Sequence, residues 1–487
     1  MTQYGEGTAT QNIYNEKPKE KKEINVRLSL FFDGTLNNRV NIEEREKAKL
    51  NNLIASPYYS HKTDDGNNSY DNGRTNIAIM EPHLLDTSKG YDLALKEYIE
   101  GQGTFNLEGD STIGYVMGGL SSGVAGRAVQ GIECGLLLII KNIKSSKYCI
   151  KKLTIDVFGF SRGAATARYA IHLLLKGSAK LSNEYSDSYM QETPPLIENI
   201  ANHGVEIHEN AVEILFAGLY DTVLSYYGSQ KLKFKWLGNV LQQNAIKHAK
   251  KALHLAAADE HRQDFPLHNI KSAGSKGEEY YLPGVHSDVG GSYNTASDLA
   301  IEAEIDPDKK VYMLSTNEKE LIILKSIKKN KLKKDREKLI KQAWYNEDQI
   351  KINSQYHGRS SSHQLIVNRE SISSAYCNIP LKVMAKYSRD ENVNLELNVK
   401  LDRRANIILK PYDELSDLEN KIHQYISEKK GNGLSKAEDW LSENSSWNKF
   451  IITNKIRNKH FNFSAHPGWG YSPRIKNGNR TRYVYKA

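Results

Sequence analysis

The strongest constraint on the fold is an apolar run, a tight turn and an alanine-rich segment in KLTIDVFGFSRGAATARYAIHLLL (152–175). The β-prone residues at 153–158 predict a buried strand, and the alanine-rich residues predict a helix. Between them Ser161 is flanked by Gly159 and Gly163, and a backbone reversal this sharp requires such small residues. The sequence therefore predicts a strand, a turn whose serine hydroxyl stands clear of the sheet, and a helix.

Ser161 is a candidate nucleophile because of this context. The N-terminus of the following helix points free N–H groups and its positive dipole end at the serine, which favours a developing oxyanion. The backbone N–H of Arg162 is the first candidate donor. The same G-x-S-x-G pattern recurs around Ser121, but no strand precedes it, and the glycine-rich apolar stretch 109–138 is typical of close helix packing.

A second strand is predicted at 26–32, and it runs into the turn DGTL (33–36). Gly34 and Thr35 in this loop are candidates for the second oxyanion-hole N–H group. A turn capped by the Asp33 side chain fits the same residues equally well. The D-x-D-G-T motif of haloacid dehalogenases is excluded, because Phe31 occupies the position of its nucleophilic aspartate.

Two further strand ends carry groups suited to a catalytic triad. The apolar run 212–220 ends at Asp221, the candidate acid, and the run 279–285 leads to His286, the candidate base, in a glycine-rich loop. The order Ser161, Asp221, His286 is that of α/β-hydrolases and differs from that of chymotrypsin and subtilisin. Asp288 is either an alternative acid or a group that holds the loop.

These elements predict an α/β fold, with an α/β-hydrolase-like, mostly parallel sheet flanked by helices, a helical charged insertion and a C-terminal extension. The 487 residues exceed one ordinary domain. We expect a flexible tail at 1–25, a catalytic core at 26–300, a lysine-rich helical insertion at 301–375, and a region at 376–487 that packs back on the core. Further helices are predicted at 250–266, 378–389 and 412–430, with His254 and His261 as structural or surface residues.

The lysine-rich stretch LIILKSIKKNKLKKDREKLIKQAW (321–344) reads as an amphipathic helix. Such a helix is able to lie on an anionic bilayer or to pack as a charged surface helix on the core. The net charge of +9 fits anionic partners, but acidic residues are interleaved with the basic ones. Nucleic acid is not expected as a partner, because no groove-reading motif is present.

Other features exclude several classes of protein. The N-terminal residues are polar, so no secretory signal is expected, and no apolar run reaches the ~18 residues that span a bilayer. Three cysteines without C-x-x-C spacing indicate folding in a reducing compartment. The carboxylates of the loop 56–75 do not have the spacing of an EF-hand calcium site or its terminal glutamate, so we interpret this stretch as a solvated loop. We expect neither a metal nor an organic cofactor.

Five motifs together resemble one family: FFDGTLNN (31–38), FGFSRGAA (158–165), GLYDTV (218–223), ADEHRQDFPL (258–267) and PGVHSDVGGSY (283–293). They resemble the hydrolase domain of the first class of type VI secretion lipase effectors, which are antibacterial phospholipases. The resemblance covers about residues 26 to 300.

This resemblance implies a serine phospholipase of A1 or A2 type that acts on membrane phospholipids, with a triad at Ser161, Asp221 and His286. It also implies synthesis in the cytoplasm without a signal peptide and delivery by the type VI machinery to the periplasm of a rival cell. A spike protein and a cognate immunity protein are the implied partners. The residues leave open an esterase or acyltransferase on a soluble substrate, and a non-catalytic membrane-binding protein on a hydrolase scaffold.

Overall fold

The computed structural model describes residues 20–50, 69–111, 123–143, 147–177, 194–224, 239–293, 318–326, 329–357, 360–390, 392–430, 435–465, 472–476 and 479–485. The predicted tail at 1–25 lies mostly outside these residues, as do the loop 56–68, the second serine motif around Ser121 and residues 294–317. The three cysteines are free thiols. Within the described ranges, no helix is both long and apolar enough to cross a membrane.

The centre of the fold is a seven-stranded sheet in which every pairing is parallel. Its strand order is β2 (Leu93–Ile99), β1 (Lys22–Phe32), β3 (Tyr148–Phe160), β5 (Val212–Tyr220), β6 (Lys251–Ala257) and β8 (Gly277–Leu282), with β4 (Glu206–Ile207) beside β3. Parallel sheets are covered on both faces, which explains the nearly continuous apolar runs of these strands. The predicted α/β fold with a mostly parallel sheet is confirmed.

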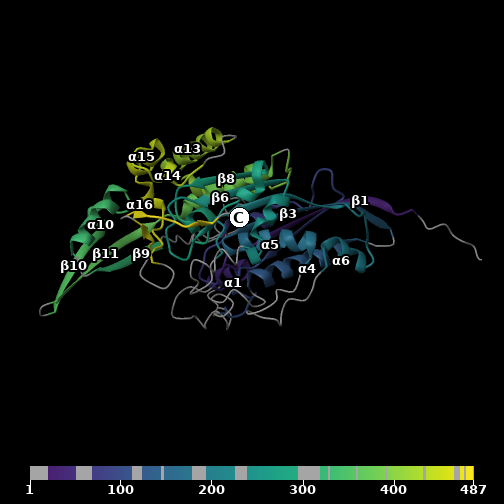
Figure 1. The fold of residues 1–487 in the computed structure, drawn as a ribbon, viewed down its shortest axis with the longest axis horizontal. Coiled ribbons are helices and arrows are strands. Elements are labelled where there is room, and N and C mark those ends of the chain that lie inside the picture. The colour runs from purple at the N-terminus through teal and green to yellow at the C-terminus, as the bar shows by residue number, and fades with distance from the viewer. Residues whose placement is uncertain are drawn as a thin grey trace, which may run out of the picture.

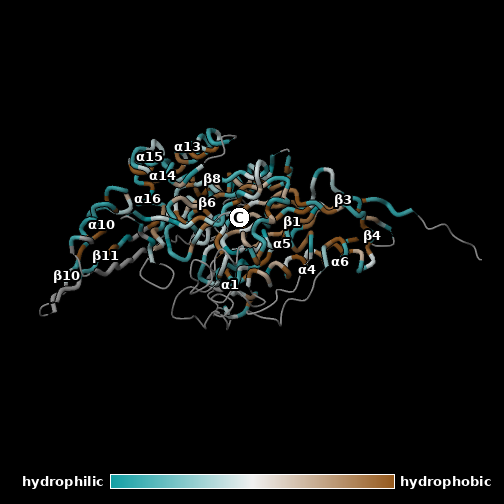
Figure 2. Tube along the Cα trace, in the orientation of Figure 1, coloured by the Kyte–Doolittle hydropathy of each residue, from teal (hydrophilic) through white to brown (hydrophobic). Residues whose placement is uncertain are grey.

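Two hydrophobic cores lie on opposite faces of this sheet. Along β1, Leu28, Leu30 and Phe32 contribute to one core, whereas Phe31 contributes to the other. The first face is covered by α4 (Val124–Asn142), α5 (Arg162–Lys176) and α6 (Leu196–Asn202), which lie below the sheet in Figure 1. Figure 2 shows apolar residues concentrated on the central strands and on α4 and α5.

The second face is covered largely by residues from the C-terminal part of the chain. The helices on this face are α11 (Asn378–Ser388), α12 (Lys400–Leu409), α13 (Asp413–Lys429), α14 (Glu438–Leu441), α15 (Ser446–Thr453) and α16 (Ile456–His460). The short helix α2 (Asn76–Met80), from the N-terminal part of the chain, packs on the same face. The helices predicted at 378–389 and 412–430 are confirmed as α11 and α13. Helix α1 (Arg39–Leu50) follows β1.

The predicted helix at 250–266 was wrong, because residues 251–257 form strand β6. Alanine and leucine favour a helix in isolation, but this segment is buried between β5 and β8. Burial on both faces of the sheet therefore outweighs intrinsic helix propensity.

The described residues of the insertion predicted at 301–375 form strands as well as a helix, which corrects the predicted helical insertion. Helix α10 (Lys329–Lys341) accompanies a three-stranded antiparallel sheet of β9 (Glu318–Ser326), β11 (Ser360–Ile372) and β10 (Ile350–His357), which extends to the left in Figure 1. Leu332 and Leu339 of α10 are buried in the protein core. The apolar side of α10 is therefore occupied within the molecule, whereas Lys333, Lys334 and Lys341 are exposed.

Candidate active site

Ser161 occupies the turn between β3 and α5, with the backbone at φ 59° and ψ −126°. A positive φ is strained for a serine, and strain of this kind is typical of a nucleophile elbow. A Cβ at Gly159 would lie 2.4 Å from the Gly163 carbonyl oxygen, and one at Gly163 would lie 2.3 Å from the carbonyl oxygens of Phe32 and Asp33. Both glycines are therefore required by close backbone approach.

Asp221 lies at the corresponding end of the neighbouring strand. The Ser161 N–H donates to the Tyr220 carbonyl at 3.0 Å, and the Val223 N–H donates back to the Ser161 carbonyl at 3.3 Å. Asp221 is fully buried, and its Oδ1 accepts from the Ala257 N–H at 2.8 Å. The two hydrogen bonds between residues 220–223 and Ser161 hold the turn at Asp221 directly beside the turn at Ser161.

His286 begins α8 (His286–Gly290) after β8, and its Nδ1 lies 2.5 Å from Asp221 Oδ2. Its imidazole packs on the rings of Phe160, at 4.6 Å, and Phe265, at 5.1 Å between centroids. Because Phe160 immediately precedes Ser161, the structure brings Asp221 and His286 together in the neighbourhood of the serine turn. With Nδ1 bonded to the acid, Nε2 is the nitrogen left to exchange a proton.

The electrostatics keep Asp221 ionised and His286 neutral. Burial by itself would raise the pKa of the Asp221 carboxyl, but Arg482 and His286 outweigh burial and hold this pKa well below its ordinary value. The pKa of His286 is lowered by burial, against the opposing effect of Asp221. Since the carboxylate carries no proton, His286 Nδ1–H is the donor in their hydrogen bond.

Asp288 forms no hydrogen bond with the His286 imidazole. Its carboxylate oxygens accept hydrogen bonds from the Val285 N–H at 2.8 Å and from the Asn462 N–H at 3.3 Å. Burial raises its pKa well above the ordinary value. Of the two candidate acids, Asp221 is thus the one bonded to His286, and Asp288 fastens the start of α8 to the C-terminal part of the chain.

The loop after β1 lies against the N-terminal end of α5. Arg162 Nε donates to Thr35 Oγ1 at 2.6 Å, which ties the residue after the serine to this loop. The Gly34 N–H already donates to Asp33 Oδ1 at 2.7 Å, so the predicted capped turn is present. Of the two candidate loop donors, Thr35 N–H is therefore the one we retain beside that of Arg162.

Asp33, the first residue of this loop, has a buried carboxyl group. Its Oδ1 accepts from Thr75 Oγ1 at 2.7 Å, and its Oδ2 accepts from the Tyr98 hydroxyl at 2.5 Å. Burial raises its pKa to about 6, although these bonds act in the opposite direction.

The predicted structural role of two histidines agrees with their burial. His254 Nε2 accepts from the Thr222 N–H at 3.0 Å, and His261 Nδ1 lies 2.8 Å from the Asp259 carbonyl oxygen. In the described part of the chain, no group of three or more His, Cys, Asp or Glu side chains is arranged to hold a metal ion.

Two charged residues at the site were missed by the sequence analysis. Glu260 Oε2 accepts from the His286 N–H at 3.2 Å and pairs with Arg262 at 2.8 Å. Arg482 donates to both oxygens of Asp221, at 2.6 and 2.7 Å. Glu260 falls in one of the five family motifs, whereas nothing in the sequence around Arg482 distinguishes it from other basic residues near the C-terminus.

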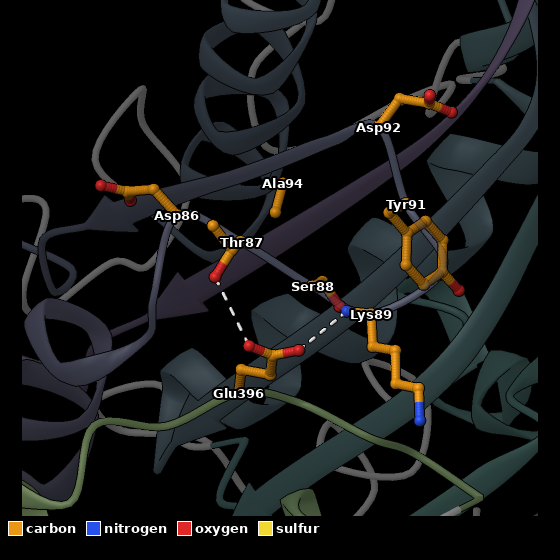
Figure 3. A pocket seen from close by; sticks show the side chains of 8 residues that line it. All are labelled: Asp86, Thr87, Ser88, Lys89, Tyr91, Asp92, Ala94 and Glu396. Carbon is orange, nitrogen blue, oxygen red and sulfur yellow. Dashed lines mark hydrogen bonds between the residues drawn. The ribbon is translucent and has the colours of Figure 1, made fainter.

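A separate pocket of about 400 Å³ lies near the amino end of β2, where Asp92 directly precedes the strand. Figure 3 shows Glu396 among the lining residues, hydrogen-bonded to the backbone N–H of Lys89 and the hydroxyl of Thr87. Ser161 and Asp221 follow the carboxyl ends of their strands, whereas this pocket lies at the amino end of β2. The pocket and the proposed site are therefore at opposite ends of the parallel strands.

The chain is similar in sequence and in fold to known proteins. Residues 27–305 match the family model described as T6SS, phospholipase effector Tle1-like, catalytic domain. The structure of the Tle1 effector bound to the VgrG spike from the type VI secretion system has a TM-score of 0.55 at 19% identity, over 99% of both chains. An uncharacterized protein from Pseudomonas aeruginosa gives a TM-score of 0.39 at 14% identity, over 88% of this chain and 56% of that one.

Comparison with curated proteins gave no match. The solved effector structure shows a shared fold, and the family model covers more than half of the chain. The chain therefore belongs to the Tle1-like phospholipase effectors of the type VI secretion system.

Proposed function

We propose that the chain is a serine phospholipase of A1 or A2 type, which hydrolyses acyl esters of glycerophospholipids. The observation that carries this proposal is the buried Asp221–His286 hydrogen bond beside the strained serine turn. Membership of a family of phospholipase effectors supports the substrate class.

In the proposed first step, Ser161 Oγ attacks the ester carbonyl carbon while His286 Nε2 accepts the hydroxyl proton. Asp221 holds the imidazole in the tautomer that leaves Nε2 free, and it stabilises the imidazolium that forms. The backbone N–H groups of Arg162 and Thr35 then stabilise the tetrahedral oxyanion. Removal of one such donor typically costs about 3 kcal/mol of transition-state stabilisation.

Collapse of this intermediate releases the lysophospholipid, whose leaving oxygen takes the proton from His286, and leaves an acyl group on Ser161. Water then attacks the acyl-enzyme with His286 again as the base. The bond between the acyl carbon and Ser161 Oγ breaks, Oγ takes the proton back from His286, and the fatty acid departs. No step in this sequence uses a metal ion or an organic cofactor.

The test is lipid-product analysis with the purified full chain. Phospholipid vesicles and dispersed short-chain esters serve as substrates, and Ser161→Ala is compared with the native chain. We expect fatty acid and lysophospholipid from vesicles, and a loss of about 10⁴-fold or more with Ser161→Ala. Cleavage of soluble esters without preference for vesicles would favour a soluble substrate. Unchanged cleavage and toxicity in Ser161→Ala would favour a non-catalytic membrane-binding protein.

We further propose that the chain is carried by a type VI spike protein and acts on the membrane of a rival cell from its periplasm, with an immunity protein protecting the producer. The spike-bound effector of similar fold supports the spike as a partner. Co-purification with a type VI spike protein of the producing cell tests this partner. Growth arrest on periplasmic but not cytoplasmic expression, relieved by co-expression of the immunity protein, tests the site of action.

A further inference from the structure

Arg482 forms a two-pronged ion pair with the acid of the proposed triad. Its Nη1 donates to Asp221 Oδ1 at 2.6 Å, and its Nη2 donates to Oδ2 at 2.7 Å. The Arg482 side chain is only 7% exposed, and the Asp221 side chain is fully buried. Oδ2 is also the oxygen that accepts from His286 Nδ1, so one carboxylate joins the guanidinium to the imidazole.

The backbone around Arg482 is fixed by the core. Strand β14 (Val484–Tyr485) pairs in parallel with β7 (Leu267–His268), and the Leu267 N–H donates to the Tyr483 carbonyl at 2.8 Å. Arg482 Nε donates to the Phe265 carbonyl at 2.7 Å. Because the Phe265 ring packs against His286, the same short segment contacts both the guanidinium and the imidazole.

We propose that Arg482 is a positioning residue of the hydrolase: it fixes the rotation of the Asp221 carboxylate and balances its charge, so that the residues 479–485 complete the active site. This inference rests on the proposed function, because Arg482 acts only through Asp221 and His286. A guanidinium group can fix a carboxylate in this way because it donates one hydrogen bond to each carboxylate oxygen. It also remains positively charged throughout the pH range of an enzyme assay.

The charge of Arg482 has a consequence for proton transfer. Charged groups around the imidazole come from several elements, namely Asp221 after β5, Glu260 and Arg262 after β6, Arg482 before β14, and Asp288 on the same helix. Removing the Arg482 cation leaves the charge of Asp221 less compensated beside the imidazolium. Protonation of His286 then becomes more favourable, and the acid limb of the rate profile moves to higher pH.

The experiment compares Arg482→Gln and Arg482→Lys with the native full chain on a soluble short-chain ester. We expect Arg482→Gln to lower kcat by about 10- to 100-fold with KM little changed. The acid limb of kcat/KM should move to higher pH in this variant. Arg482→Lys keeps the charge but loses the fork, so it should lower kcat with a smaller shift of the limb.

Arg474→Gln is the matched control from the same part of the chain. The Arg474 guanidinium lies on the Tyr483 ring at 2.9 Å, and it makes no recorded bond to Asp221. We expect native kcat and a native pH profile for this variant.

Folded Arg482→Gln with an unmoved acid limb would overturn the inference, even if its kcat were reduced. If Arg482→Gln does not fold, native kcat in Arg482→Lys would overturn it instead. The two proposals fail separately: loss of activity in Ser161→Ala together with native behaviour of both Arg482 variants contradicts only this inference, whereas full activity in Ser161→Ala contradicts the proposed hydrolase itself.

Discussion

The backbone N–H of Ser161 donates to the carbonyl of Tyr220 across 3.0 Å, so the last residue of β5 is bonded to the turn that ends β3. Ser161 and Asp221 are 60 residues apart in sequence, yet parallel pairing of β3 and β5 places their turns side by side. Both residues have positive φ, at 59° and 41°. Each strand therefore ends in a strained turn, and the two turns place Ser161 and Asp221 at the carboxyl ends of neighbouring strands.

Asp221→Asn should lower kcat by about 10⁴-fold in the ester assay. An amide N–H facing His286 Nδ1 favours the wrong imidazole tautomer, so Nε2 is no longer free to accept the serine proton. Steady-state kinetics on a soluble ester measure this change.

Asp288→Asn is the comparison that separates the two candidate acids. Asp288 bonds to the Val285 and Asn462 backbones, so we expect a loss of less than about tenfold in kcat, together with a lower melting temperature. A larger loss of kcat in Asp288→Asn than in Asp221→Asn would assign the acid to Asp288.

The acid limb of kcat/KM should have its midpoint below 6.5, the ordinary pKa of histidine. Burial lowers the pKa of His286 more than Asp221 raises it, so the neutral base persists into mildly acidic solution. Initial rates on a soluble ester, between about pH 4 and pH 8, measure the midpoint without the local pH of a lipid surface. A midpoint above 6.5 would contradict the assignment of His286 as a buried base.

Gly163→Ala should reduce both stability and activity. The added methyl group would lie 2.3 Å from the backbone carbonyl oxygens of Phe32 and Asp33, and backbone atoms have little freedom to move away. We expect a loss of about 1–3 kcal/mol in the free energy of unfolding. Denaturant titration measures it, with Gly109→Ala as the control, because a Cβ there meets nothing within 4 Å. Equal stability of the two variants would contradict close packing of the elbow on the β1 loop.

Asp33 should make the protein less stable as pH rises. Its pKa is raised from 3.8 to about 6 in the folded state, mainly by burial, so between these values the folded chain binds more protons than the unfolded chain. The contribution of Asp33 is therefore fully present below the unfolded pKa and is lost as pH rises through the folded one.

Asp33→Asn removes this titration. The stability of the native chain relative to Asp33→Asn should fall between about pH 4 and pH 7, as measured by denaturant titration at several pH values. A constant difference across this range would show that Asp33 does not titrate as described.

Local sequence identified the strands that carry the proposed site, because each is an apolar run ending in a turn or a glycine-rich loop. The prediction failed at 250–266, where alanine and leucine favour a helix but neighbouring strands bury the segment as β6. It also failed at 321–326, where lysines suggested a continuous amphipathic helix and the chain forms β9. In both segments, pairing with strands distant in the sequence makes the chain a β-strand. The hydrophobic periodicity of one segment does not show which strands it will pair with.

The sequence by itself determined the elbow and the residue types of the proposed triad, because these depend on neighbours within a few positions. Only the tertiary structure decided that Asp221 rather than Asp288 bonds to His286 and that Arg482 pairs with Asp221. These relationships join side chains tens to hundreds of residues apart. The order of strands in the sheet and the docking of β14 on β7 bring them within hydrogen-bonding distance, and no local pattern specifies either.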